Sequence, residues 1–496
     1  MSKKLPIFYS ALLLTGVNLL LRMVSTSFQV YLSGKIGAAG IGLLQMVLSV
    51  GSLTMTAGMA GIRTATMYLT SEELGKNHRE NIRWILSGCV KYSLFCSGTV
   101  AIVLFAFSPE IAKNWIGDTD TVVTIRLFSC FLPINCLCGV MVGYFTAANR
   151  IGTLAVVEIV EQAISMMLTI ALLHFWANSD QIRSCAAIII GSGFSSCTTL
   201  LILLVLQKLE KSKFGHKISV GKRLLKTAVP LALADDLKSG ISTAENLMVP
   251  KRMELCKKIE NPLASFGLVS GMVFPVLMFP AAILYGLAEL LIPELARCSA
   301  AGSQQRIQYL AGRSLRIAVL YGCVFCGLLF LLSEELCVLL YNNLEAGRYL
   351  RWFSVLIPML YCDAITDAMI KGLGQQTASV RYNILTSCMD VMLLFLLLPQ
   401  YGIEGYYVSF LVTHLLNFIL SVRRLLKITG KLFSWGLPIA SGFGLVIAIF
   451  LSNTLANPPL KIGTFILLLG SLLYIFRVVS REDAAWLKGL VSKKLM

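Results

Sequence analysis

The chain alternates between long apolar segments and short polar connections along its whole length. Each apolar segment is close to or above 20 residues, which is the length at which an α-helix crosses a bilayer. Such runs are too long and too uniform for the alternating strands of a β-barrel. The pattern predicts fourteen membrane-spanning helices, at residues 6–32, 41–69, 84–108, 122–147, 153–177, 185–207, 227–250, 263–293, 314–341, 350–373, 383–400, 405–426, 434–453 and 460–479.

The first predicted helix carries a polar stripe within its apolar sequence. Thr15, Asn18, Arg22, Ser25 and Gln29 follow one another at steps of three or four residues, so they share one face of an α-helix. An arginine near the bilayer centre costs roughly 2.5–3.5 kcal/mol, and it therefore needs an ionic partner or a water-filled cavity. Both interpretations of Arg22 stay open at this stage.

Polar and charged residues recur at helical spacing in other spans and in both halves of the chain. The residues that we expect to line a cavity are Asn18, Arg22, Gln29, Gln45, Arg63, Lys238 and Lys371. The carboxylates that we expect inside the spans are Glu158, Glu161, Asp235, Asp236, Glu245, Asp363, Asp367 and Asp390. Asp235 and Asp367 each have a lysine three or four residues further on, so both also fit an ion pair within one helix.

The simplest explanation for so many charges in apolar helices is a shared hydrophilic cavity between two helical bundles. Several cations in one cavity suit an anionic group such as a phosphate or a diphosphate. The carboxylates suit a coupling cation or a proton. Structural ion pairs remain the alternative for each residue taken singly.

Composition agrees with this prediction. Of the 496 residues, 56% are hydrophobic and only 14% are charged, as expected for a polytopic α-helical membrane protein. The net charge of +17 is concentrated at alternate ends of the predicted spans. This positive-inside distribution predicts a multi-pass protein of the cytoplasmic membrane with both termini in the cytoplasm, and it argues against a nucleic-acid partner.

The most basic connection follows the sixth span, at residues 208–226. It divides the first twelve spans into two six-helix lobes, at residues 1–207 and 227–430. Because each lobe has an even number of spans, we expect two parallel repeats related by a pseudo-twofold axis along the membrane normal. Residues 431–496 then add two helices and a cytoplasmic tail.

Motifs for catalysis are missing from the sequence. It has no P-loop, no H-E-x-x-H and no G-x-S-x-G. The segment Asp118-Thr119-Asp120 resembles the D-x-D of membrane glycosyltransferases, but it lies in a short predicted loop without an accompanying external domain. The fourteen cysteines lie mostly in apolar segments and the four histidines are scattered. We therefore expect a protein that is not an enzyme and has no metal site.

Three segments resemble a known superfamily. They run from Gly37 to Met46, from Asn246 to Arg252, and from Phe266 to Met272 with a continuation at Leu291–Leu295. The chain is similar here to the multidrug/oligosaccharidyl-lipid/polysaccharide exporters, and most to their stage V sporulation protein B branch of polysaccharide and lipid II flippases. The specific parts of the resemblance are the Val-Pro-Lys-Arg run that ends at Arg252 and the Gly-Met-x-x-Pro run that begins at Gly271.

The resemblance implies a fold and a function. It implies two lobes that open alternately to either side of the membrane, and a flippase for an undecaprenyl-linked saccharide, either a peptidoglycan precursor or a polysaccharide repeat unit. A role in spore cortex synthesis also follows from it. The partners would be the polyprenyl-diphosphate-linked saccharide and membrane lipids, and we expect a monomer without a cofactor, driven by Na⁺, H⁺ or the membrane potential.

Relatives with fourteen spans use the last two helices to flank a groove for the polyprenyl tail. They often carry a second basic residue about two turns after the first arginine, where this chain has Gln29. Two other functions stay open: a cation-coupled multidrug exporter of the same fold, and a membrane transferase acting on lipid-linked sugars. The exporter would need a pocket rich in acids and aromatic rings, and the transferase would need a catalytic histidine or an acidic metal-binding loop.

Overall fold

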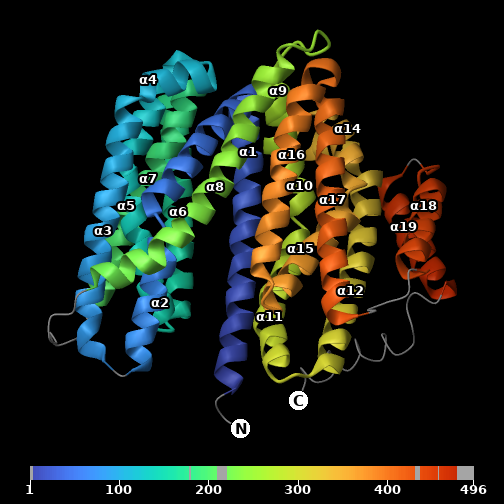
Figure 1. The fold of residues 1–496 in the computed structure, drawn as a ribbon. Coiled ribbons are helices and arrows are strands. Elements are labelled where there is room, and N and C mark those ends of the chain that lie inside the picture. Colours follow the sequence, from blue (N-terminus) through green and yellow to red (C-terminus); the bar gives the residue numbers. More distant parts are fainter. Residues whose placement is uncertain are drawn as a thin grey trace. The chain divides into compact units, whose positions relative to one another are not determined.

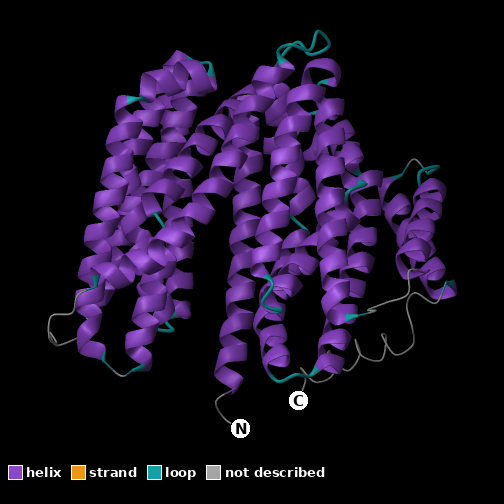
Figure 2. Cartoon of the chain, viewed as in Figure 1, coloured by secondary structure: helices purple, strands orange, loops and turns teal. Residues whose placement is uncertain are grey.

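The computed structural model describes residues 4–76, 78–177, 180–208, 220–430, 436–455 and 457–476. All regular secondary structure in these ranges is helical (Figures 1 and 2), and no strand occurs within them. The predicted all-α class is therefore confirmed. Contacts within the chain divide it into two compact units, Met1–Gly271 with Val391–Ile403, and Met272–Asp390 with Glu404–Met496.

The helices up to residue 267 belong to the first unit. They are α1 (Lys4–Met59), α2 (Ile62–Gly75), η1 (Arg79–Asn81), α3 (Ile82–Ala106), α4 (Ser108–Glu110), η2 (Ile111–Ile116), η3 (Thr119–Thr121), α5 (Val122–Ala147), α6 (Ile151–Leu172), η4 (Leu173–Ala177), α7 (Gln181–Lys208), α8 (Gly221–Met253) and α9 (Pro262–Gly267). The π-helix η5 (Leu268–Val273) follows α9 directly.

The remaining helices begin after the unit boundary at residue 271. They are α10 (Phe274–Met278), α11 (Ala281–Ala300), α12 (Gln304–Leu331), α13 (Ser333–Tyr341), α14 (Leu344–Ser354), α15 (Ile357–Gly372), α16 (Gln376–Tyr401), α17 (Ile403–Thr429), α18 (Gly436–Ser452) and α19 (Pro458–Ile475). The last turns of α16, from Val391 onward, belong to the first unit.

Among these ranges, nine helices are long and apolar enough to cross a membrane, and eleven are if each of two bent pairs counts as one span. Each of the fourteen predicted spans nevertheless coincides with helix. Spans one and two count once because the helix continues past the kink at Gly37. Helix α8 is long enough but too polar, and α18 is apolar but, at 17 residues, too short. The total of fourteen therefore stays a prediction.

The predicted linker and tail lie largely outside the described residues, which omit 209–219 and 477–496. The lobe boundaries stay a prediction for the same reason. One repeated interaction supports the two-repeat interpretation. Arg126 donates from Nε to Ser108 Oγ (3.0 Å), and Arg351 donates from Nε to Ser333 Oγ (3.3 Å), with 18 residues between the partners in both cases.

Helices α1 and α9 cross at a contact that only glycine allows. A Cβ atom on Gly267 would lie 2.0 Å from the carbonyl oxygen of Ala38 and 2.7 Å from the backbone nitrogen of Gly42. A Cβ atom on Gly42 would lie 2.2 Å from the carbonyl oxygen of Leu263. Small residues at such positions let two backbones approach closely. Both glycines belong to the segments that carry the resemblance, so these segments have a packing role.

Hydrogen bonds tie the C-terminal part of α8 to α1. Thr243 Oγ1 donates to the carbonyl oxygen of Ser49 (3.0 Å), and Asn246 Nδ2 donates to Ser49 Oγ (3.0 Å). Buried polar groups paired in this way fix the register of one helix on another. The α8 residues between these bonds and the start of the helix therefore face a defined part of α1.

The end of α8 is held by the Val-Pro-Lys-Arg run. Lys251 donates from Nζ to the carbonyl oxygen of Asn114. Arg252 donates from Nη2 to the carbonyl oxygen of Phe395 (2.9 Å), and its guanidinium lies 3.6 Å from the centroid of the Phe395 ring. A cation over an aromatic face is attracted by the ring's quadrupole. The Val-Pro-Lys-Arg run thus fixes the end of α8 to neighbouring helices of the first unit.

The glycine crossing gives the first prediction. Gly267→Ala places a methyl group on the backbone of α1, and overpacking of this kind costs about 1–3 kcal/mol. The variant is expected to unfold at a lower temperature than the unaltered protein in detergent. A dye that reacts with thiols exposed on unfolding measures this, because several cysteines, such as Cys89, are buried.

Gly98→Ala is the matched control, because a Cβ atom on Gly98 meets nothing within 4 Å. Alanine favours the helix over glycine by up to about 1 kcal/mol, so Gly98→Ala should keep or raise the melting temperature. Equal melting temperatures for Gly267→Ala and Gly98→Ala would contradict the close crossing.

Candidate functional site

The first unit contains a cavity of about 420 Å³. Its walls come from the second half of α1, the turn into α2 and the middle of α8. The lining residues are Ser52, Met55, Thr56, Met59, Gly61, Arg63, Thr64, Asp235, Lys238, Ser239 and Ser242. In both α1 and α8 the lining residues follow the spacing i, i+3, i+4 and i+7, so each helix turns one face toward the cavity.

The turn between α1 and α2 explains the position of Arg63. Ala60 (φ 42°) and Gly61 (φ 69°) both adopt left-handed backbone conformations, which end α1 and redirect the chain. Glycine adopts this conformation without a steric penalty. Arg63 therefore stands in the first turn of a new helix and lines the cavity.

Arg63, Lys238 and Asp235 are the charged residues of the lining, and they give it one net positive charge. All three are exposed to solvent, and in the part of the chain that the structure describes none of them forms an ion pair. Two cations that line one cavity and form no ion pair in the described residues are available to an anionic ligand.

Next to this cavity, α8 holds two buried oxygen atoms that lack hydrogen-bond partners in the described structure. They are Asp236 Oδ1 and Ser239 Oγ. Buried polar atoms are normally bonded to protein or to water. Ser239 lines the cavity itself, so a ligand or a water molecule there has an available hydroxyl.

Other predicted cavity residues lie elsewhere. Arg22 is exposed on α1 and Gln45 is half-buried, and the described lining includes neither. Gln29 donates from Nε2 to the carbonyl oxygen of Gly271 (3.1 Å), so it joins α1 to the segment after α9. The side chain of Asn18 lies outside the described part of the structure, and Glu245 is half-buried on α8.

The two acids of α6 differ in their surroundings. Glu161 accepts a hydrogen bond from Ser196 Oγ on α7 (3.1 Å). Glu158 is half-buried and interacts electrostatically with Arg63. An acid thus lies near the Arg63 guanidinium without forming an ion pair with it in the described residues.

The second unit brings the remaining acids together with hydroxyl and amide groups of α16 and α17. Asp390 accepts hydrogen bonds from Ser409 Oγ (2.6 Å) and from Thr413 Oγ1 (3.2 Å). Asp363 accepts one from Asn417 Nδ2 (3.0 Å). Both carboxylates are thus held by neutral donors and not by cations.

Asp367 and Lys371 form an ion pair with 2.6 Å between Oδ2 and Nζ, and Asp367 also accepts a hydrogen bond from Ser379. The lysine of this helix is therefore engaged by the acid one turn before it. In the described residues no group of three or more His, Cys, Asp and Glu side chains is placed to hold a metal ion.

Sequence reasoning missed the partners of these acids. Ser409, Thr413 and Asn417 follow one another at steps of four, and all three are at least nine-tenths buried. The sequence did contain a signal for these partners, namely a stripe of polar residues in an otherwise apolar span. It is weaker than a charge, because serine and threonine also bond to the carbonyl of their own helix.

The chain matches the MatE family model over residues 15–179 and 257–396, which is more than half of its length. Stage V sporulation protein B of Bacillus subtilis (strain 168) is 21% identical over 95% of this chain and 96% of its own.

Two solved structures share the fold. The lipid II flippase MurJ, in its inward closed conformation, has a TM-score of 0.69 at 14% identity over 94% of this chain and 98% of its own. An inward-facing multidrug resistance MATE family transporter of the MOP superfamily has a TM-score of 0.67 at 13% identity over 84% of this chain and 100% of its own.

These matches confirm the resemblance that the sequence indicated, and the chain is a multi-pass membrane protein. It belongs to the MatE family.

Proposed function

We propose that this protein is a flippase that moves a polyprenyl-diphosphate-linked saccharide across the cytoplasmic membrane by alternating access. The headgroup would pass through the cavity of the first unit while the polyprenyl tail stays in lipid. The observation that carries the proposal is the pair of cations, Arg63 and Lys238, which line one cavity and form no ion pair in the described structure.

The chemistry of the lining favours a phosphorylated ligand. A guanidinium binds phosphate oxygens through two parallel N–H groups, and an ammonium adds a compact point charge. Hydroxyl groups from α1, α2 and α8 surround the two cations, and they are suited to the hydroxyl and amide groups of a sugar. The printed names of the relatives, a sporulation protein and a lipid II flippase, agree with this class of substrate.

Multidrug export is the second candidate, because a multidrug resistance transporter shares the fold. A pocket for organic cations needs aromatic faces or an excess of carboxylates. The described lining contains no aromatic residue, and its two cations outnumber its one acid. The charge of the cavity therefore favours an anionic substrate over a cationic drug.

We further propose that the acids of the second unit bind the coupling ion. Asp363 Oδ1 and Asn417 Oδ1 are both buried and lack donors in the described structure, although Asn417 Nδ2 bonds to the other carboxylate oxygen of Asp363. Buried oxygen atoms without donors favour a proton or a small cation. Asp390, with its two hydroxyl donors, offers a second carboxylate of the same kind.

Loss of either cavity cation is the first test. Arg63→Gln and Lys238→Gln each remove a charged hydrogen bond worth about 1.5–3 kcal/mol, so the dissociation constant of a short-chain polyprenyl diphosphate saccharide should rise by roughly 10- to 100-fold. Binding to the protein in lipid nanodiscs measures this, and transport into proteoliposomes should fall in parallel.

Lys91→Gln is the matched control, because Lys91 is an exposed lysine of α3 outside the described lining. This variant should bind like the unaltered protein. If Arg63→Gln and Lys238→Gln also keep full affinity, the cavity does not receive the diphosphate. Recovery of a chemically altered lipid would point instead to a transferase.

Asp390→Asn tests the coupling proposal. The amide keeps the size of the side chain but removes the charge that a cation or proton needs, so transport should lose its dependence on an ion gradient. Substrate binding should stay unchanged, because Asp390 lies outside the described lining. Transport measured with and without Na⁺ and pH gradients checks this.

Asp120→Asn, in the exposed loop before α5, is the control and should keep the gradient dependence. Full gradient dependence in Asp390→Asn would remove this residue from the coupling mechanism.

A further inference from the structure

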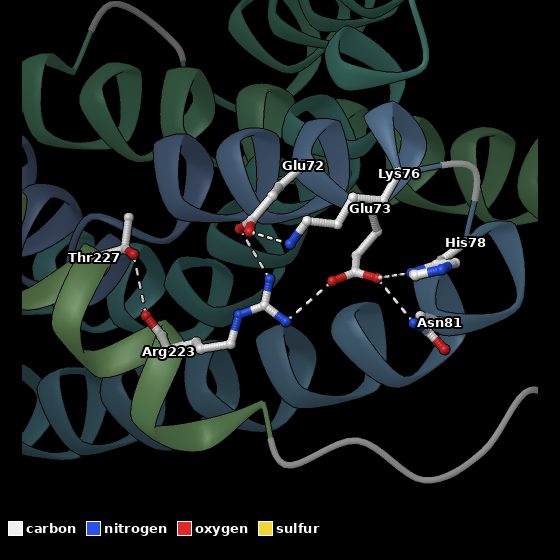
Figure 3. Close-up of polar contacts among 7 residues, drawn as sticks. All are labelled: Glu72, Glu73, Lys76, His78, Asn81, Arg223 and Thr227. Carbon is white, nitrogen blue, oxygen red and sulfur yellow. Dashed lines mark hydrogen bonds and ion pairs between the residues drawn. The ribbon is translucent and has the colours of Figure 1, made fainter.

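A cluster of charges joins the end of α2 to the start of α8 (Figure 3). Arg223 places Nη2 2.9 Å from Glu72 Oε2 and Nη1 3.0 Å from Glu73 Oε1, so one guanidinium spans two carboxylates. These carboxylates raise the pKa of the Arg223 guanidinium above its ordinary value, with the hydrogen bond to Glu72 as the largest cause. We call Arg223, Glu72 and Glu73 the clasp.

Neighbouring groups hold the two carboxylates in place. The side chain of Glu73 is only 4% exposed, and its Oε2 accepts a hydrogen bond from Asn81 Nδ2 (2.8 Å). Lys76 Nζ lies 2.6 Å from Glu72 Oε1. His78 Nδ1 also lies 3.6 Å from Glu73 Oε2, so this buried carboxylate has partners besides Arg223.

Below the clasp, the first turns of α8 are packed against apolar residues. Leu224 and Ala228 are buried in one core with Ile62 and Leu69 of α2 and Ile85 of α3. This apolar contact and the clasp together seal the start of α8 onto α2.

The clasp and the cavity lie on the same two helices. On α2, Arg63 precedes Glu73 by about 15 Å of helix, and on α8, Arg223 precedes Lys238 by about 22 Å, at 1.5 Å per residue. The sealed contact therefore lies between the cavity and the end of the unit where α8 begins. Release of this contact would open that end of the cavity.

A proline separates the sealed part of α8 from the part that lines the cavity. Pro230 lies inside α8, and proline removes one hydrogen bond of the helix and favours bending there. Beyond it, Thr243 and Asn246 bind α8 to Ser49 of α1. The first turns of α8 can therefore move while the remainder stays attached.

We propose that the clasp is the latch of a gate: residues 221–229 close one end of the cavity while Arg223 holds Glu72 and Glu73, and open it by bending at Pro230 when Arg223 lets go. Release is feasible because Arg223 and Glu72 are about one-third exposed, at 36% and 33%, so water can replace that ion pair. Glu73 keeps its hydrogen bond from Asn81 and the nearby His78 ring when Arg223 leaves. This proposal goes beyond the proposed function and does not depend on the identity of the substrate.

The test uses the lysine of the cavity itself. The full chain is reconstituted in proteoliposomes and treated with a membrane-impermeant, amine-acetylating reagent, and the acetylation of Lys238 is quantified by mass spectrometry. Lys226 is exposed near the start of α8, so its acetylation shows that the reagent has reached the end of the first unit where α8 begins. Arg223→Gln shifts the gate toward its open state, so acetylation of Lys238 should increase severalfold relative to Lys226.

Lys222→Gln is the matched control, because it removes the same charge from the neighbouring residue, which is exposed and outside the clasp. Its Lys238 acetylation should equal that of the unaltered protein. Glu72→Gln breaks one arm of the clasp at a partly exposed position, and it should give an intermediate increase even if Arg223→Gln does not fold. Unchanged Lys238 acetylation in Glu72→Gln and in any folded Arg223→Gln, with Lys226 fully labelled, would overturn the latch.

The outcome is independent of substrate binding, because acetylation needs no lipid-linked sugar. A protein that fails to bind the diphosphate can still show the latch, and one without the latch can still bind it.

Discussion

A charged side chain on an apolar helix must find a partner, because hydrocarbon offers it neither a hydrogen bond nor a counter-charge. This constraint accounts for most of the polar contacts in the chain. Asp367 meets it with Lys371, Arg223 with two glutamates, and Asp390 with two hydroxyl groups. Arg63 and Lys238 differ from these residues, because they line a cavity and form no ion pair in the described part of the chain.

Helix α8 connects these features within the first unit. Its start is fixed to α2 by charge, its middle lines the cavity, and its end is anchored by Lys251 and Arg252. Such a helix is too polar to resemble an ordinary membrane span, and it needs neighbours along its whole length. Its stability and its function therefore rely on the same contacts.

The fold was predictable because apolar runs near 20 residues leave few alternatives to membrane helices. The Arg63 and Lys238 positions were also predictable, since both stand on polar stripes. Helical spacing predicts which residues share one face of a helix, but it does not predict which element packs against that face. Gln29 lies on the same stripe as Arg22, yet it bonds to Gly271 in the segment after α9.

The clasp also shows that the sequence alone does not predict which residues a side chain will contact. Sequence reasoning placed Arg223 in a basic connection, because a lysine-rich segment at the membrane surface ordinarily needs no partner. Only the fold brings it to Glu72 and Glu73, about 150 positions away in the chain. Long-range ion pairs of this kind leave no periodic signal in a single sequence.

The glycine crossing of α1 and α9 has a bearing on how such proteins are recognised. Two of the segments that carry the resemblance meet where the backbones of α1 and α9 touch at Gly42 and Gly267, and neither glycine belongs to the described cavity lining. A likeness in these segments therefore reports a shared packing of helices and not a shared ligand. Comparing members of the family by what they bind requires the side chains that line the cavity beside Arg63.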